Sequence, residues 1–194
     1  MESQNVFLAK WSVFSAVLLG LAWRALPIRA DLNTQFSDHH FWIETLLWLA
    51  TAISAAIAVY RNAMPGRPEG VAGGLAAGLS ILVTGSLLLR GNYAGFSQEF
   101  QSELAFDRGI CGPLIVAFAA LEALALYVWI RKAAPTRLSA TGAWIALSSA
   151  SLGAFALQFI CAHDSMPHLL IWHLLPVTVL ALIGFSFGRR LLRW

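Results

Sequence analysis

The residues best suited to chemistry lie near the end of the chain, in the segment ICAHDSMPHLLIWH from Ile160 to His173. This segment holds Cys161, three histidines, an aspartate and a methionine, and long apolar runs flank it. The other cysteine of the chain, Cys111, lies near the start of an earlier apolar run. Thiolate sulfur and imidazole nitrogen bind soft and borderline metal ions, and thiolates also react with oxidants. The segment therefore indicates metal or redox chemistry.

Three states of the cysteine pair agree with these residues. Cys111 and Cys161 could form a disulfide or a redox pair if their Cα atoms approach within about 4.4–6.8 Å. Alternatively, the two thiolates with His163 or His168 could bind Zn²⁺ or Cu(I), and the thioether of Met166 weakly favours copper. The third alternative is two unrelated cysteines in apolar surroundings. The sequence leaves the three alternatives open.

Other titratable residues are weaker candidates for a site. His39 and His40 follow Asp38 and are expected to be solvated loop residues, and His173 is expected to form a hydrogen bond near a membrane interface. Glu122 lies inside an apolar run, where an ionised carboxylate is expensive. We expect it to be protonated, paired with a neighbouring helix, or part of an ion path. The chain has no phosphate-binding glycine loop, metalloprotease motif or nucleophilic serine turn, which argues against an enzyme.

The composition places these residues in an integral membrane protein. The chain of 194 residues is 58% hydrophobic and 12% charged, and its mean hydropathy is +0.68. Soluble domains carry about 25% charged residues. The apolar residues also fall into blocks of about twenty, the length that crosses the hydrocarbon core of a bilayer. The net charge of +3 is better explained by membrane topology than by nucleic-acid binding.

An all-α fold is predicted, with six transmembrane helices in a single domain over residues 1–194. The predicted helices cover residues 6–26, 41–60, 70–89, 109–130, 139–160 and 168–188. In the third helix, Gly70, Gly74 and Gly78 are four residues apart, a spacing that allows another helix to approach closely. Pro176 removes a backbone hydrogen bond from the sixth helix, so we expect a kink there.

The basic residues predict that both termini lie in the cytoplasm, because cytoplasmic loops carry an excess of lysine and arginine. This orientation leaves Arg24, Arg29, Arg90 and Arg108 outside. It places the remaining nine of the thirteen basic residues inside: Lys10, Arg61, Arg67, Arg131, Lys132, Arg137, Arg189, Arg190 and Arg193. Cys111 and Cys161 then lie at the outer face. The short connector RKAAPTRL makes their two helices antiparallel neighbours, so we expect the cysteines at similar depth.

Several of these segments together resemble the NrsF-type multi-pass anti-sigma factors of proteobacteria. They are RADL, FSDHHFW, the Cys111 entry to the fourth helix, the RKAAP turn, CAHDSMPHLLIWH and the terminal GRRLLRW. The resemblance covers nearly the whole chain, and its most specific parts are the spacing of the two cysteines and the sequence LLRW. It implies a bacterial inner-membrane regulator that holds an extracytoplasmic-function sigma factor and releases it under stress.

The resemblance also implies roles for particular residues. Cys111 and Cys161 would face the periplasm and sense redox or heavy-metal stress. Family members usually carry a cytoplasmic segment before the first helix, whereas MESQN alone precedes it here. Either the true start lies upstream, or the sigma factor binds the basic cytoplasmic turns and tail, or this member has lost that partner. The residues expected to face the partner are Arg61, Arg67, Arg131, Lys132 and Arg137. The alternative function is a small membrane transporter or metal-handling protein.

Overall fold

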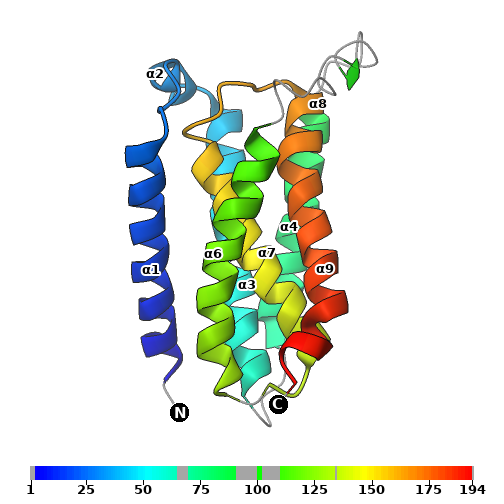
Figure 1. Ribbon diagram of the computed structural model, residues 1–194. Coiled ribbons are helices and arrows are strands. Elements are labelled where there is room, and N and C mark those ends of the chain that lie inside the picture. Colours follow the sequence, from blue (N-terminus) through cyan, green and yellow to red (C-terminus); the bar gives the residue numbers. More distant parts are fainter. Residues whose placement is uncertain (1–2, 65–69, 91–99, 102–109, 134, 194) are drawn as a thin grey trace.

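The computed structural model describes residues 3–64, 70–90, 100–101, 110–133 and 135–193. Within these ranges, long helices stand side by side as a bundle (Figure 1). The first five spans are α1 (Gln4–Ala25), α3 (His39–Ala63), α4 (Gly70–Arg90), α6 (Cys111–Arg131) and α7 (Leu138–Leu157). The sixth is built from α8 (Met166–His168), the π-helical segment η2 (Leu169–Leu174) and α9 (Leu175–Leu191). The short α2 (Leu32–Gln35) lies between α1 and α3.

The predicted number of helices able to cross a membrane is confirmed among the described residues. Six helices are long and apolar enough to cross a membrane, and their ends differ from the predicted ends by a few residues. The start of α1 and the end of α9 lie at the same end of the bundle (Figure 1). We name this the terminal end. The opposite end carries α2, α8 and both cysteines, and we name it the thiol end.

Helix α7 lies at the centre of the bundle and packs against α3, α6 and α9. Most of its side chains are buried, and small residues such as Ser148 and Ala150 make that possible because they let neighbouring backbones come close. The Ser148 hydroxyl donates a hydrogen bond of 2.9 Å to the carbonyl oxygen of Ala52 on α3. A hydroxyl in hydrocarbon needs such a partner, so this bond fixes the facing sides of α3 and α7.

The backbones of α7 and α9 approach each other closely at three glycines, Gly142, Gly184 and Gly188. A Cβ atom on Gly142 would lie 2.2 Å from the carbonyl oxygen of Gly184, and one on Gly188 would lie 2.4 Å from that of Leu138. The glycine spacing predicted in α4 does not serve this purpose among the described residues. Added Cβ atoms on Gly74 and Gly78 would meet nothing within 4 Å. Close helix packing is therefore built on α7 and α9, where the sequence analysis did not place it.

The sixth span is irregular just before Pro176. The backbone N–H of Leu175 donates to the carbonyl oxygen of Leu170, five residues earlier, which is the hydrogen-bond pattern of a π-helix. Pro176 has no N–H to offer to an α-helical bond, and a π-turn takes up the mismatch. The structure places a π-helical segment here, and the kink expected from Pro176 stays a prediction.

Helix α1 lies at the edge of the bundle and buries few residues. Phe7, Trp11 and Ser15 face inward, and most of its other side chains are exposed or half-buried. The Ser15 hydroxyl donates a hydrogen bond of 2.9 Å to a carboxylate oxygen of Glu122 on α6. Glu122 is fully buried, so this bond supports the expectation that it is paired with a neighbouring helix.

Candidate metal and redox centre

The two cysteines meet at the thiol end although they are far apart in the sequence. Cys111 is the first residue of α6. Cys161 follows α7 in a tightened last turn, where its backbone N–H donates to the carbonyl oxygen of Leu157 at 2.8 Å. Both cysteines are buried, and their sulfurs are 3.2 Å apart. The predicted neighbouring, antiparallel arrangement of α6 and α7 therefore brings the thiols into direct contact.

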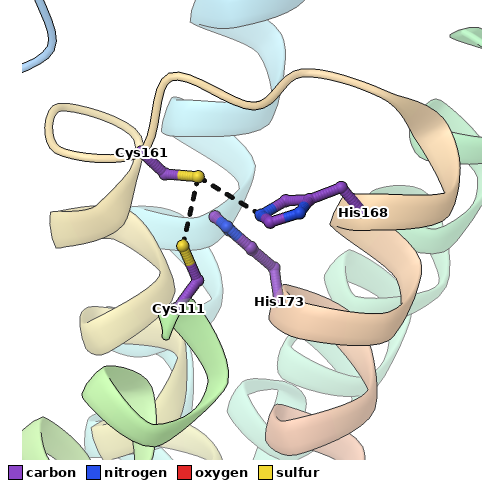
Figure 2. A group of neighbouring side chains, drawn as sticks. All are labelled: Cys111, Cys161, His168 and His173. Carbon is purple, nitrogen blue, oxygen red and sulfur yellow. Dashed lines mark hydrogen bonds between the residues drawn. The ribbon is translucent and has the colours of Figure 1, made fainter. Parts of the chain in front are cut away.

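Two histidines of the sixth span complete the cluster (Figure 2). The Nε2 atom of His168 lies 3.3 Å from the sulfur of Cys161, and the rings of His168 and His173 are 5.6 Å apart. One ligand atom from each of Cys111, Cys161, His168 and His173 can be chosen so that all four lie within 4.8 Å of one another. Figure 2 shows both imidazoles directed toward the sulfurs. The four side chains can therefore reach a common point.

The π-helical segment positions the second histidine. His168 and His173 are five residues apart, and in an α-helix such residues would point about 140° away from each other. A π-helix closes hydrogen bonds between residues five apart, so it brings them to nearly the same side. Trp172 packs against α6 at Gly112, which has no side chain. A Cβ atom on Gly112 would lie 3.1 Å from the ring of Trp172. This contact holds the segment beside Cys111.

The cluster changes the acidity of the Cys161 thiol, which lies in the loop between α7 and α8, outside the membrane spans. The hydrogen bond from Cys111 lowers the pKa of the Cys161 thiol, and the contact with His168 acts in the same direction. A low thiol pKa increases the thiolate fraction, and the thiolate is the form that reacts with oxidants and binds metals. Cys161 is therefore poised for either chemistry.

An ion network ties down the loop that carries Cys161. Arg29, buried between α1 and α2, donates hydrogen bonds to both carboxylate oxygens of Asp31, each at 2.8 Å, and to both of Asp164. Gln35 adds a bond of 3.1 Å to Asp164. The guanidinium group of Arg29 holds the pKa of Asp31 well below its usual range. Because Asp164 lies between Cys161 and His168, the network fixes the loop around the cluster.

The structure brings together some of the predicted site residues and separates others. Cys111, Cys161 and His168 meet, whereas His163 is exposed and lies outside the four-residue group, with its ring 5.1 Å from that of His168. His39 is exposed, its ring lies 4.3 Å from that of His40, and neither belongs to the four-residue group. The sequence analysis missed His173 as a cluster residue. The signal was a histidine five residues from another, just before a proline that disturbs the helix.

Four of the five residues predicted to face a partner lie at the terminal end. Arg131, Lys132 and Arg137 are exposed in the turn between α6 and α7, and Arg61 is half-buried near the end of α3. Arg67 lies outside the described residues. Two hollows open here. One, of about 250 Å³, includes Lys10, Lys132, Tyr60 and Trp129 in its lining; the other, of about 470 Å³, includes Arg137, Arg189 and Arg193.

Comparison with known proteins identifies the chain. Its sequence matches the NrsF family, described as "Negative regulator of sigma F", over residues 1–194. The chain belongs to the NrsF family. It is 31% identical over 186 residues to the protein named "Anti-sigma-F factor NrsF" of Caulobacter vibrioides (strain NA1000 / CB15N), covering 93% of this chain and 84% of that protein. No solved structure matches the chain.

Membership in the NrsF family confirms the predicted resemblance. The family is regulatory and not catalytic, in agreement with the lack of a catalytic motif in the sequence. The buried thiol pair and the basic terminal end are thus features of a multi-pass membrane protein from a family of sigma-factor regulators.

Proposed function

We propose that this protein is a negative regulator of an extracytoplasmic-function sigma factor. It holds the sigma factor at the bacterial inner membrane and releases it when redox or metal stress changes the state of Cys111 and Cys161. The observation that carries the proposal is the family match over the whole chain. The structure supports it with a buried thiol pair at one end of the bundle and exposed basic residues at the other.

Both termini lie in the cytoplasm in this proposal. Among the described residues, eight basic residues belong to segments of the terminal end, and positively charged segments are retained in the cytoplasm. The start of α1 and the end of α9 share that end, as an even number of membrane spans requires (Figure 1). The thiol end then faces the periplasm, where oxidants and metal ions arrive first.

The sigma factor binds the terminal end. Arg61, Arg67, Arg131, Lys132 and Arg137 supply positive charge to an acidic face of the partner. The hollow that includes Arg137, Arg189 and Arg193 is a second basic feature of this end and can receive a carboxylate-bearing side chain. Aromatic residues of the other hollow, such as Tyr60 and Trp129, offer apolar contact area to a partner.

A chemical change at the cysteines alters how α6 and α7 are tied. The sulfurs are 3.2 Å apart, so a disulfide needs only a small movement. In that step the two thiols lose two protons and two electrons to a peroxide, which is reduced at its O–O bond. A metal ion instead binds both thiolates. Either change can shift the balance between two bundle arrangements that differ by a few kcal/mol.

The shift reaches the terminal end through stiff helices. Helix α7 begins beside the basic turn and ends beside Cys161, and it packs closely on α9 over Gly142 and Gly184. Packed helices move as rigid bodies because an interior at crystal-like density has few alternative arrangements. A change at the thiols therefore moves the turn that contains Arg137.

Gene deletion and co-purification test the proposal. Deletion should raise transcription of the genes that depend on one extracytoplasmic-function sigma factor, and that sigma factor should co-purify with the protein in detergent. Reporter fusions at Arg67, Arg137 and Trp194 should all report a cytoplasmic position. Unchanged transcription after deletion would favour the transporter or metal-handling function, and a periplasmic signal at Arg137 would contradict the topology.

A further inference from the structure

The strongest unexplained feature of the thiol end is the pair of buried histidines beside the thiols. His168 and His173 are 0% and 1% exposed. Neither ring nitrogen of His173 has a hydrogen-bond partner among the described residues. Buried polar groups are nearly always paired, because an unpaired one loses its bonds to water without replacement. The contact of His168 with Cys161 suits a redox pair as well, but a redox pair alone leaves both ring nitrogens of His173 without a hydrogen-bond partner in the described part of the chain.

We propose that Cys111, Cys161, His168 and His173 form a closed Cys₂His₂ site for Zn²⁺. The proposal deepens the sensing part of the proposed function, and its consequence for release of a sigma factor rests on that function. Zinc binding itself is a property of this chain alone.

The positions of the ligand atoms fit one tetrahedral ion. Zinc–sulfur and zinc–nitrogen bonds of about 2.3 and 2.0–2.1 Å place neighbouring ligand atoms about 3.4–3.8 Å apart. The Cys111 and Cys161 sulfurs are 3.2 Å apart, the Cys161 sulfur is 3.3 Å from Nε2 of His168, and all four ligand atoms lie within 4.8 Å of one another. Shifts of a few tenths of an ångström in side chains convert this cluster into a tetrahedron.

Charge balance favours the same ion. Two thiolates and two neutral imidazoles carry a charge of −2, which a divalent cation neutralises. All four residues are buried at the end of a transmembrane bundle, where uncompensated charge is costly. Zn²⁺ also prefers four ligands of sulfur and nitrogen without an open position, which is the arrangement of a structural site.

The proposed zinc site explains the π-helical segment. The segment brings His173 to the side of the helix that carries His168, and an α-helical path through the same residues would turn His173 away. The site therefore ties together three elements: the start of α6, the end of α7 and the start of the sixth span. Loss or replacement of the ion changes three helices at once, which a bond between Cys111 and Cys161 alone would not.

Metal content of the full chain, purified in detergent without any sigma factor, tests the site. The wild-type chain should contain about one Zn²⁺, and a competing chelator should give a tight dissociation constant. His168→Asn and His173→Asn should each weaken zinc binding by about 100-fold or more. The control is His163→Asn, which removes the same side chain beside His168 but outside the group. Its zinc affinity should stay within about threefold of wild type.

Two further measurements separate loss of a ligand from loss of the fold. Co²⁺ bound to the wild-type chain should show the visible bands of a tetrahedral ion and a thiolate charge-transfer band. His173→Cys should bind Zn²⁺ again, because it restores a fourth ligand, although it restores no imidazole contact.

Three outcomes would overturn the inference: a wild-type chain that binds no Zn²⁺, His173→Asn with wild-type affinity, or His163→Asn with the same loss as His173→Asn. Failure of the sigma-factor experiments with zinc binding intact would overturn the proposed function and leave the site standing.

Discussion

The two ends of the bundle are built in opposite ways. At the thiol end the side chains that could react are buried and packed in contact, and Arg29 bridges the two segments that surround them. At the terminal end, residues such as Lys132 and Arg137 are exposed around open hollows. A buried cluster responds only to small species that reach its ligand atoms. An exposed basic surface suits a large partner, which charge attracts from a distance. In the proposed function, this difference separates a region for detection from a region for binding.

The connection between the two ends is the first target. Gly142→Ala and Gly184→Ala place a Cβ atom 2.2 or 2.4 Å from a backbone oxygen of the facing helix, so α7 and α9 must separate. We expect a loss of about 1–3 kcal/mol in the free energy of unfolding, with impaired binding of the sigma factor. Thermal unfolding in detergent measures the first effect. Gly74→Ala is the matched control, since its Cβ atom meets nothing within 4 Å. If Gly74→Ala destabilised the protein as much as Gly142→Ala or Gly184→Ala, the close packing of α7 on α9 would be contradicted.

The second prediction concerns the rigidity of the thiol end. Arg29→Met removes the bridge and leaves the carboxylates of Asp31 and Asp164 without it, at a cost of about 2–3 kcal/mol by the usual worth of charged hydrogen bonds. The midpoint of thermal unfolding should fall, and proteolysis should cut the loop near Cys161 faster. Arg24→Met, at an exposed position near the end of α1, should change neither. An Arg29→Met chain as resistant as wild type would refute a fixed loop.

The third prediction concerns the terminal end. The double variant Arg137→Gln with Arg189→Gln removes two charges from one hollow, and we expect the sigma factor to bind about 3–10-fold more weakly. Binding of the wild-type protein should weaken as salt rises, since salt screens exposed charges. Pull-down titrations at two ionic strengths measure both effects. The Arg24→Gln variant, changed at the thiol end, should bind the sigma factor like wild type. If it lost as much affinity as the double variant, the sigma factor would not distinguish the two ends.

The smallest effect is a pH dependence that should be absent in the physiological range. Arg29 lowers the pKa of Asp31 below its ordinary value of 3.8. A carboxylate with a lowered pKa stabilises the fold above the ordinary value and loses that contribution only as the pH falls below it. The difference in unfolding midpoint between wild type and Asp31→Asn should therefore be constant from about pH 8 to pH 5. The difference should shrink only as the pH falls below about 4, and a difference that stays constant from about pH 5 to pH 2 would show that the pKa of Asp31 is not lowered.

Much of the fold could be predicted from the sequence because it depends on the hydropathy of successive residues and on the lengths of the connectors. Apolar blocks of membrane-spanning length predicted six helices, and the short RKAAPTRL connector predicted that Cys111 and Cys161 would be neighbours. His173 could not be found that way. Its position depends on a π-helical segment, and an α-helical period turns it away from His168.

Packing and ion pairing were also hidden from the sequence. Glycines occur in α4 as well as in α7 and α9, and only the tertiary arrangement shows that Gly142 faces Gly184 whereas Gly74 faces nothing. Arg29 and Asp164 are 135 residues apart, so no local pattern joins them. Long-range pairs of this kind are set by the path of the chain.

Release of the sigma factor from isolated membranes tests most directly whether the thiol end controls the terminal end. The fraction that sediments with the membranes is measured before and after addition of a peroxide or Cd²⁺, for wild type, Cys111→Ser, Cys161→Ser and the double variant. Wild type should release the sigma factor. The three variants should behave alike and show no response, because a shared bond or a shared ion is lost as soon as one thiol is removed. Single variants that differ from each other, or a double variant that still responds, would contradict control by the paired thiols.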